Sequence, residues 1–370
     1  MECPRLDDSV DRIWTCLLDF KEWNKNAGSA PDTQSVFLCQ TGTQCDSNVW
    51  KFAATPKIVA DICPNGIIVV YLPGSVVHKA DLISDPLPGC PSLLTFDISA
   101  LSTGQSPWTY LRGPHQPFNL LTAFRFYLPY LMGHHIALQR RAPWVSGHLA
   151  QTLDGRIATR DGHSQWISNR ANRKHSHRLR ALHDAVLVGR GTVENDDPLL
   201  TVRDVPGSNP GRVILDRECC LLAKDKPYRI FTEQGRNWVL HSDCITKVGQ
   251  TNAAGHNTTI VAVREIEDES GSRVMDPEAI LEAIWREGIC SVFIEGGSRT
   301  LSHFLGADRI DLLHLHMAPV LLGSGIPSFT LPAVARIQDG ISFHMNHFCL
   351  DQEILLECVP LRKGHEATLG

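Results

Sequence analysis

The pattern of hydrophobic and polar positions changes near residue 140. Before it, apolar runs are short and separated by turn residues, which predicts strands at 67–72 and 93–98, while helical spacing of apolar residues predicts a helix over 8–23. A longer apolar stretch, 118–138, predicts a helix that packs the two halves of the chain together or buries its face in a second subunit. We therefore expect a small α+β domain over residues 1–140, whose function the pattern does not indicate.

Strands and helices alternate after this point. Strands are predicted at 145–149, 185–188, 212–216, 229–232, 258–263 and 291–295, and helices at 169–183, 276–287 and 298–305. The last apolar segments, 311–322, 341–348 and 354–360, have little helical punctuation and predict an antiparallel finish. This alternation predicts an α/β fold over residues 143–362, with a mainly parallel sheet flanked by helices.

The composition argues against some classes of function but does not identify one. The chain of 370 residues has a formal net charge of −5 and a sequence pI near 6.4, so it lacks the overall positive field that draws proteins onto nucleic acid. No run reaches the ~18 apolar residues of a membrane span. The first residues lack a secretory apolar segment, so we expect a cytoplasmic protein that binds neither nucleic acid nor membranes. An anionic ligand would need a local cluster of Arg and Lys.

Twelve cysteines are present, but none forms a Cys-x-x-Cys pair. A His-x-Glu followed by Pro-Cys-x-x-Cys, the signature of the zinc deaminases, is absent as well. We therefore predict no metal site, and cysteines that are mostly reduced and buried.

Two segments at predicted strand ends carry residues suited to ligand binding. In 152–158 a buried strand ends in an Asp-Gly turn and leads to a loop with Ser164 and Trp166. This indicates a ligand loop, as at other α/β strand ends, or a hairpin with Trp166 in the core. In 185–193 an apolar strand ends in Gly-x-Gly-Thr, where glycines allow close approach to a phosphate. Carboxylates and Arg203 follow, although surface loops often carry such charges.

A third segment is more specific for an anion. The strand 291–295 runs into Gly296-Gly297 and then a short helix that begins Ser298-Arg299-Thr300. Helix N-terminal amides, two hydroxyls and a guanidinium then converge on one point, which indicates a phosphate or dinucleotide site.

In order and spacing, these three segments resemble the C-terminal reductase domain of the riboflavin-biosynthesis deaminase/reductase family. The segments 212–216 and 318–325 agree with it, and the resemblance covers residues 143–360. It implies a dihydrofolate-reductase-like fold, homodimers, NADPH as cofactor, and reduction of the ribosyl group of a phosphoribosylamino-pyrimidine such as 5-amino-6-(5-phosphoribosylamino)uracil to ribityl. A reductase of another heterocycle, such as a pterin or folate, and a non-catalytic NADPH-binding protein remain alternatives.

The resemblance also implies site residues. The NADPH site would comprise Ala150, Trp166, Thr192, Asp196, Arg217, Gly296, Gly297, Ser298, Arg299, Thr300 and Leu301, within a turn that continues to residue 303. The substrate site would comprise His148, Ser164, Arg180, Leu200, Arg203 and Glu295. Arg180 and Arg203 suit a forked clamp on the 5′-phosphate, and Asp196 or Glu295 would deliver or relay a proton as the catalytic carboxylate.

Three features depart from the family. His148 stands where many members have Lys, and it is either a satisfied strand histidine or a sign of an altered reaction. Arg217 stands where a small residue is common, and it either meets the 2′-phosphate of NADP or is solvated. The N-terminal part does not look like the zinc deaminase. In addition, histidines and basic residues gather on the helix 169–183, where we expect a mostly solvated face.

Overall fold

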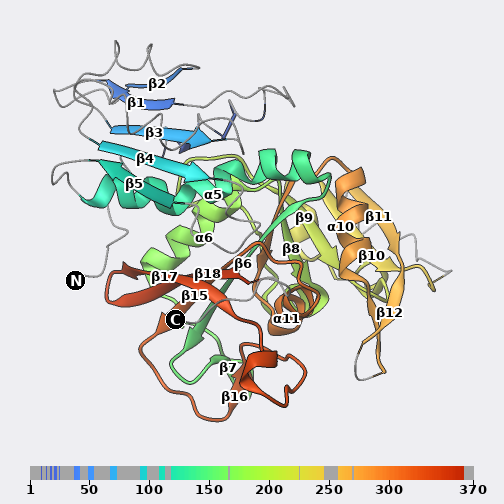
Figure 1. Ribbon diagram of the computed structural model, residues 1–370. Helices are drawn as coiled ribbons and strands as arrows, with labels where there is room; N and C mark the ends of the chain where they lie inside the picture. Colours follow the sequence, from blue (N-terminus) through green and yellow to red (C-terminus); the bar gives the residue numbers. More distant parts are fainter. Residues whose placement is uncertain are drawn as a thin grey trace.

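Figure 1 shows the computed structural model. It describes residues 141–361 except 166, 225, 246–256 and 269–270, the helix from residue 118, and the backbone of five N-terminal strands. Among the first 36 residues it describes Val10, Trp14, Leu17, Leu18, Lys21, Glu22 and Lys25, all helical. The rest of the helix predicted over 8–23 lies outside the described residues.

The N-terminal part forms a five-stranded sheet. Its strands are β1 (Phe37–Thr41), β2 (Val49–Ala53), β3 (Ile67–Leu72), β4 (Ser92–Asp97) and β5 (Trp108–Arg112). Their order is β2-β1-β3-β4-β5, with β3 and β4 parallel and the other pairs antiparallel. The strands predicted at 67–72 and 93–98 are therefore confirmed as β3 and β4.

A long helix, α5 (Phe118–Arg140), joins this sheet to the rest of the molecule. It packs against the next helix and against strand β6, with Tyr127, Tyr130 and Trp144 in the shared core (Figure 1). The predicted apolar helix thus packs the two halves of one chain together. No helix among the described residues is both long and apolar enough to cross a membrane.

A nine-stranded sheet forms the centre of the C-terminal part. Its strands are β6 (Trp144–Thr152), β8 (Ala185–Gly189), β9 (Gly211–Leu215), β10 (Asn237–Ser242), β11 (Thr258–Val263), β14 (Ser291–Glu295), β15 (Leu312–Ala318), β17 (Phe343–Leu350) and β18 (Glu353–Pro360). The order is β11-β10-β9-β8-β14-β6-β15-β18-β17, and all pairs from β11 to β15 are parallel. The predicted antiparallel finish is confirmed, because β18 pairs antiparallel with both β15 and β17, while β15 also pairs parallel with β6.

Helices cover both faces of this sheet, as predicted. They are α6 (Arg170–Leu182), α7 (Arg190–Asp196), α8 (Cys220–Ala223), α9 (Arg229–Thr232), α10 (Pro277–Arg286) and α11 (Ser298–Gly306). Cap residues explain where two of them begin. The Asn169 side chain accepts a hydrogen bond from Asn172 N, and Asp276 accepts one from Glu278 N with Pro277 in the first turn. The N-terminal ends of α6 and α10 therefore follow from side chains that satisfy free amides.

The strand predicted at 229–232 is wrong. These residues form one helical turn, α9, which buries Ile230 and Phe231, and the neighbour of β9 in the sheet is β10, which the pattern missed. Short pairs escaped prediction too: β7 (Arg156–Thr159) with β16 (Gly325–Pro327), and β12 (Glu265–Glu267) with β13 (Arg273–Met275). The strand after residue 152 thus pairs with a distant segment, β16, so the alternative of a local hairpin there is wrong.

The solvated face expected for the helix 169–183 is also wrong. Four of its polar residues, His175, His177, Arg178 and His183 (the C-cap), are buried. They are covered because α6 lies between the sheet and the N-terminal helical residues: Trp14 Nε1 donates to Pro206 O at 2.8 Å, and the Arg178 guanidinium lies over the Trp14 ring. The prediction of reduced thiols holds at five described cysteines and fails at Cys349, which is disulfide-bonded.

Candidate active site

The turn between β14 and α11 is built to receive an anion. Gly296 and Gly297 have φ of 69° and 76°, a left-handed backbone that glycine adopts without strain. No side chain caps α11, so its first amides are free to bind a ligand. The Ser298 side chain is buried, and its Oγ has no hydrogen-bond partner. Free amides and an unsatisfied hydroxyl at one point fit a phosphate group of a cofactor.

The end of β8 faces this turn. A Cβ built on Gly189 would lie 2.8 Å from Thr300 Oγ1, so a larger residue here would displace the Thr300 hydroxyl. A Cβ on Gly297 would lie 3.4 Å from Thr192 Oγ1. Thr192 belongs to α7, which follows β8, and Thr300 belongs to α11, which follows β14. The hydroxyls of two predicted cofactor residues therefore approach the turn from helices that begin at the ends of neighbouring parallel strands.

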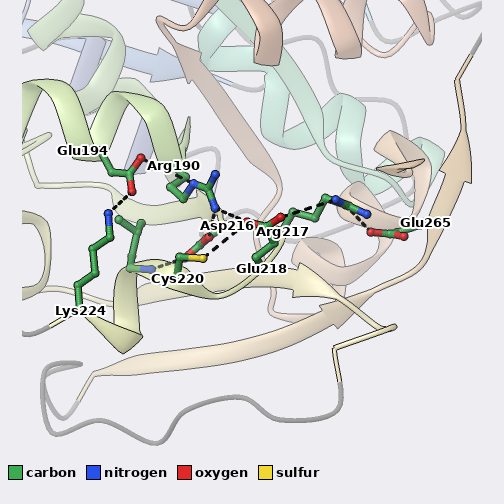
Figure 2. Close-up of polar contacts among 9 residues, drawn as sticks. Arg190, Glu194, Asp216, Arg217, Glu218, Cys220, Lys224 and Glu265 are labelled. Atoms are coloured by element: carbon green, nitrogen blue, oxygen red, sulfur yellow. Dashed lines mark hydrogen bonds and ion pairs between the residues drawn. The ribbon is translucent and has the colours of Figure 1, made fainter. Parts of the chain in front are cut away.

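Figure 2 shows a charged network beside this cradle, where β8 and β9 end. Arg190, the first residue of α7, donates to Glu218 Oε2 at 2.8 Å, and Arg217 donates to Glu265 Oε1 at 2.6 Å. Glu218 also lies 3.9 Å from Arg217 Nη1, so it lies between the two guanidinium groups. The buried Asp216 accepts from Leu221 N through Oδ2, while Oδ1 makes no hydrogen bond and lies 3.7 Å from Arg190. Two arginines held by exchangeable carboxylates fit a second phosphate.

On the other side of Glu295 lies a cationic group. Arg180 donates to both carboxylate oxygens of Glu295, with Nε to Oε2 at 2.7 Å, and its Nη1 donates to Thr201 O at 2.9 Å. The side chains of Arg180 and Glu295 are 11% and 18% exposed. Burial alone would raise the pKa of Glu295, but the charge and hydrogen bonds of Arg180 outweigh it, so the pKa lies below its ordinary value. The carboxylate therefore stays ionised.

The segment after α7 brings a second arginine to this place. Leu200 is buried with φ of 53°, a left-handed conformation that turns the chain. Arg203 Nη1 then donates to Thr201 Oγ1 at 2.9 Å, and Arg203 N donates to His177 Nδ1 at 3.0 Å. Thr201 thus joins Arg180 and Arg203 through its carbonyl and hydroxyl oxygens.

His148 turns away from this group. It pairs with Glu295 in the register of β6 and β14, but its Nε2 lies 2.9 Å from Asn172 Oδ1 on α6. Burial first, and the nearby His314 second, lower its pKa to about 4, so the ring is neutral near pH 7. Of the two interpretations left open by the sequence, these contacts favour the satisfied strand histidine.

The other predicted residues are scattered around the cradle. Asp196 ends α7 with its side chain exposed, and neighbouring atoms desolvate it enough to raise its pKa. Ser164 lies exposed in the β7–α6 connection, and Trp166 lies outside the described residues. Ala150 lies on β6, Arg299 is exposed, and the buried Leu301 packs on Gly147.

Two other features lie apart from these residues. A hollow of about 500 Å³ along α6 is lined by Arg170, Ala171, Arg173, Lys174, Asp204 and Asp351, none of which belongs to the predicted site. His134, Asp184 and Cys290 place possible metal ligands within 4.8 Å of one another. Lys25 Nζ, however, lies 2.5 Å from Asp184 Oδ1 and already supplies the positive charge there.

Comparison with known proteins settles the family. A family model described as the RibD C-terminal domain matches residues 143–346, more than half of the chain. The chain belongs to the RibD C-terminal domain family. This confirms the resemblance drawn from the motifs, and the α/β architecture agrees with it.

The relatives match different fractions of this chain and of their own length. The riboflavin biosynthesis protein RibD of Bacillus amyloliquefaciens is 35% identical over 190 residues, 49% of this chain and 47% of the relative. The 2,5-diamino-6-ribosylamino-4(3H)-pyrimidinone 5′-phosphate reductase of Methanothermobacter thermautotrophicus is 31% identical over 223 residues, 58% of this chain and 97% of the relative. This chain thus spans about half the length of the RibD proteins it matches.

A solved structure covers nearly the whole chain. The deaminase/5-amino-6-(5-phosphoribosylamino)uracil reductase of Thermotoga maritima has a TM-score of 0.56 and 22% identity, and covers 95% of this chain and 99% of that one. At this identity the likeness shows the fold alone. It extends past the RibD domain into the five-stranded sheet.

The RibD domain brings most of the predicted residues to the ends of adjacent parallel strands. Arg180, Arg203 and Glu295 form one group, and Thr192, Ser298 and Thr300 another. Sequence reasoning missed Arg190, Thr201 and Asp216. Arg190 carried a usable signal, because it lies between two glycines at a predicted strand end beside the strand that carries Arg217. Thr201 carried no such signal, because it binds Arg180 through its backbone carbonyl oxygen, a group that every residue has.

Proposed function

We propose that the RibD domain of this chain is an NADPH-dependent reductase that converts the ribosyl group of a phosphoribosylamino-pyrimidine to ribityl. One observation carries the proposal: the uncapped α11 N-terminus with its unsatisfied Ser298 Oγ lies three residues after Glu295, which holds Arg180. An anion cradle and a pair of arginines, Arg180 and Arg203, therefore lie near one strand end. The Methanothermobacter relative is named as a reductase of a ribosylamino-pyrimidinone 5′-phosphate and the RibD relatives as riboflavin biosynthesis proteins, which supports a pyrimidine reductase.

The cofactor fits the two anion-binding features. The α11 amides and Ser298 Oγ would hold the pyrophosphate, with Thr192 and Thr300 beside it. Arg190 and Arg217 would exchange their carboxylate partners for the 2′-phosphate, which supports NADPH over NADH. When bound, NADPH supplies the hydride for C1′ of the ring-opened substrate.

Two positively charged side chains would hold the phosphate of the substrate. Arg203, whose side chain is exposed, and Arg180 would bind the 5′-phosphate in forked contacts. Glu295 stays ionised because Arg180 lowers its pKa, so it orients Arg180 and accepts hydrogen bonds from ribose hydroxyls. Asp196, whose pKa is raised by desolvation, is the better proton donor of the two carboxyl groups.

Dimer formation is part of the proposal. Leu153, Val320, Leu321 and Ile326 expose apolar side chains around the β7–β16 pair, and Leu153 N donates to Val320 O at 3.0 Å. The β7–β16 pair lies at the lower edge of Figure 1, and exposed apolar side chains there suit a second copy of the chain. A cytoplasmic location stays a prediction.

The function is tested by titrating the full chain with NADPH and NADH, and then adding the phosphoribosylamino-pyrimidine while reduced nicotinamide absorbance is followed. We expect NADPH to bind more tightly and to be oxidised only with substrate. Binding without oxidation by either the diamino or the deaminated compound would exclude this reaction. Absence of binding would refute the cofactor assignment.

The proposed role of Asp196 as proton donor is tested by a single substitution. Asp196→Asn removes the titrating proton at nearly constant shape, so turnover should fall by about 10²–10⁴-fold. Glu282→Gln, at an exposed carboxylate of α10 that pairs with Arg286, is the control and should keep its turnover. Full activity in Asp196→Asn would remove Asp196 from the mechanism.

A further inference from the structure

The five-stranded N-terminal sheet shares its fold with a protein whose name includes a pyrimidine deaminase. In zinc deaminases, His and Cys side chains hold Zn²⁺, and a glutamate that is not a ligand moves the protons, which produces the signature His-x-Glu followed by Pro-Cys-x-x-Cys. The fold therefore raises the question of whether this chain keeps that chemistry.

The residues present do not fit the zinc site. Neither half of the signature occurs anywhere in the 370 residues. Between residues 37 and 117 the His and Cys residues are Cys39, Cys45, Cys63, His78, Cys90 and His115, and no two of them are fewer than six positions apart. A tetrahedral zinc site needs three or four closely placed ligands of this kind.

The acid–base group is missing as well. No glutamate occurs between Glu22 and Glu194, so none lies in β1 to β5 or in the segments that join them. Two independent requirements of hydrolytic deamination, the ligands and the proton carrier, are therefore lost over the same stretch.

From this double loss we infer that the N-terminal part binds no zinc and does not deaminate, so this chain depends on another enzyme for deamination of the pyrimidine. That enzyme would add water at the ring carbon that carries the amino group, break the C–N bond, release ammonia and leave an oxo group. The step consumes water and needs no oxidant. That the two reactions share one pyrimidine rests on the proposed function, whereas the loss of zinc chemistry does not.

What the N-terminal part does retain is a packing role toward α6. Lys21 Nζ donates to Ala181 O at 2.7 Å, at the carboxyl end of the helix that carries Arg180. On α5, Tyr127 OH lies 2.9 Å from His175 Nδ1, and Tyr130 OH lies 2.9 Å from His314 Nδ1. Lys21 and Tyr127 contact α6 directly, whereas Tyr130 contacts His314 of β15, which lies 3.0 Å from His175 of α6. The N-terminal part therefore supports the helix that carries Arg180.

The test uses the purified full chain grown with added zinc, and the Thermotoga maritima protein as positive control. Metal content is measured by mass spectrometry, and ammonia release is measured with the 2,5-diamino pyrimidine phosphate as substrate. We expect substoichiometric zinc and ammonia at the no-enzyme level, while the control binds zinc and releases ammonia. Stoichiometric zinc, or ammonia release above background, would overturn the inference.

NADPH oxidation, followed in the same samples, separates this inference from the proposed function. Ammonia release together with NADPH oxidation would overturn the inference and leave the reductase standing. Absence of both signals would refute the reductase with these substrates and uphold the loss of deamination.

Discussion

The hydroxyl of Ser298 is buried without a hydrogen-bond partner, whereas nearly all buried polar groups have one. A phosphate oxygen at the α11 N-terminus would satisfy it. Ser298→Ala should therefore weaken NADPH binding by roughly tenfold or more, the value of a hydrogen bond to a charged group. Stability of the free protein should stay unchanged, because no existing bond is lost.

Ser302→Ala is the matched control on the next turn of the same helix. Ser302 Oγ accepts a hydrogen bond from Thr330 N at 2.9 Å, so this variant should lower stability and spare NADPH affinity. Fluorescence titration and urea unfolding of both variants measure the two effects. The reverse pattern would show that the Ser298 hydroxyl does not face the cofactor.

The Arg180–Glu295 pair predicts a pH dependence. The pKa of Glu295 is lower in the folded chain than in the unfolded one, so its stabilisation is complete above the unfolded pKa and is lost as pH falls through the folded value. Glu295→Gln should cost about 3–5 kcal/mol at pH 7, and the difference from wild type should shrink in acid. Glu282→Gln, which breaks an exposed pair with Arg286, should cost less than about 1 kcal/mol.

Urea unfolding at pH 7 and near pH 3.5 measures both variants. A Glu295→Gln effect that is equal at the two pH values would mean that the ion pair does not supply the stabilisation.

Among single residues, the sequence predicted those site residues whose chemical type and position along the chain both indicate ligand binding. Glu295, Ser298 and Arg203 lie at strand ends or in the loops that follow, where chemistry and pattern agree. His148 could not be assigned from sequence, because the direction of its ring depends on Asn172, a residue one helix away. Arg217 was found as a cation, but its partner Glu265 comes from a strand that periodicity did not reveal.

Helix α6 is the element on which both halves of the chain meet. Lys21 is buried against its end, and burial first, with Lys25 second, lowers the pKa of Lys21 from 10.5 to about 8. Between these values the unfolded chain binds more protons than the folded one, so stability should rise with pH from 8 to 10.5. Lys21→Met should remove that rise, which amounts to about 3 kcal/mol at most.

Unfolding free energies at pH 8 and pH 10 measure this effect. Lys226→Met, at an exposed lysine that lies over the Tyr228 ring, is the control and should keep the rise. A rise that survives in Lys21→Met would place its origin in another group.

Elements with caps were the easiest to predict. Asn169 and Asp276 mark the starts of α6 and α10 within one residue, because a cap is a local interaction. The run 229–232 shows the limit of local reasoning. Its apolar, branched residues suit a strand, but the place beside β9 is taken by β10, so Ile230 and Phe231 reach the core as a helical turn. Tertiary competition overrode propensity there.

For the whole molecule, the apolar patch around β7 and β16 predicts self-association. Leu321 is 69% exposed and lies in this patch, so Leu321→Asp should raise the dimer dissociation constant by roughly tenfold or more. Ile266→Asp, on β12 far from the patch in Figure 1, is the control. Sedimentation velocity over a range of concentrations distinguishes them. Equal behaviour of the two variants would assign the patch no role in assembly.

The burial of α6 also bears on how such a chain evolves. With His175, His177 and Arg178 shielded by the N-terminal residues and α5, a gene shortened to the RibD domain would expose a helix face already adapted to being covered. The Methanothermobacter relative, 97% of which matches only 58% of this chain, shows that a shorter protein of this family exists. Each side chain that suits α6 to its cover raises the cost of losing that cover, so the two halves of the chain are coupled in the substitutions and truncations that they tolerate.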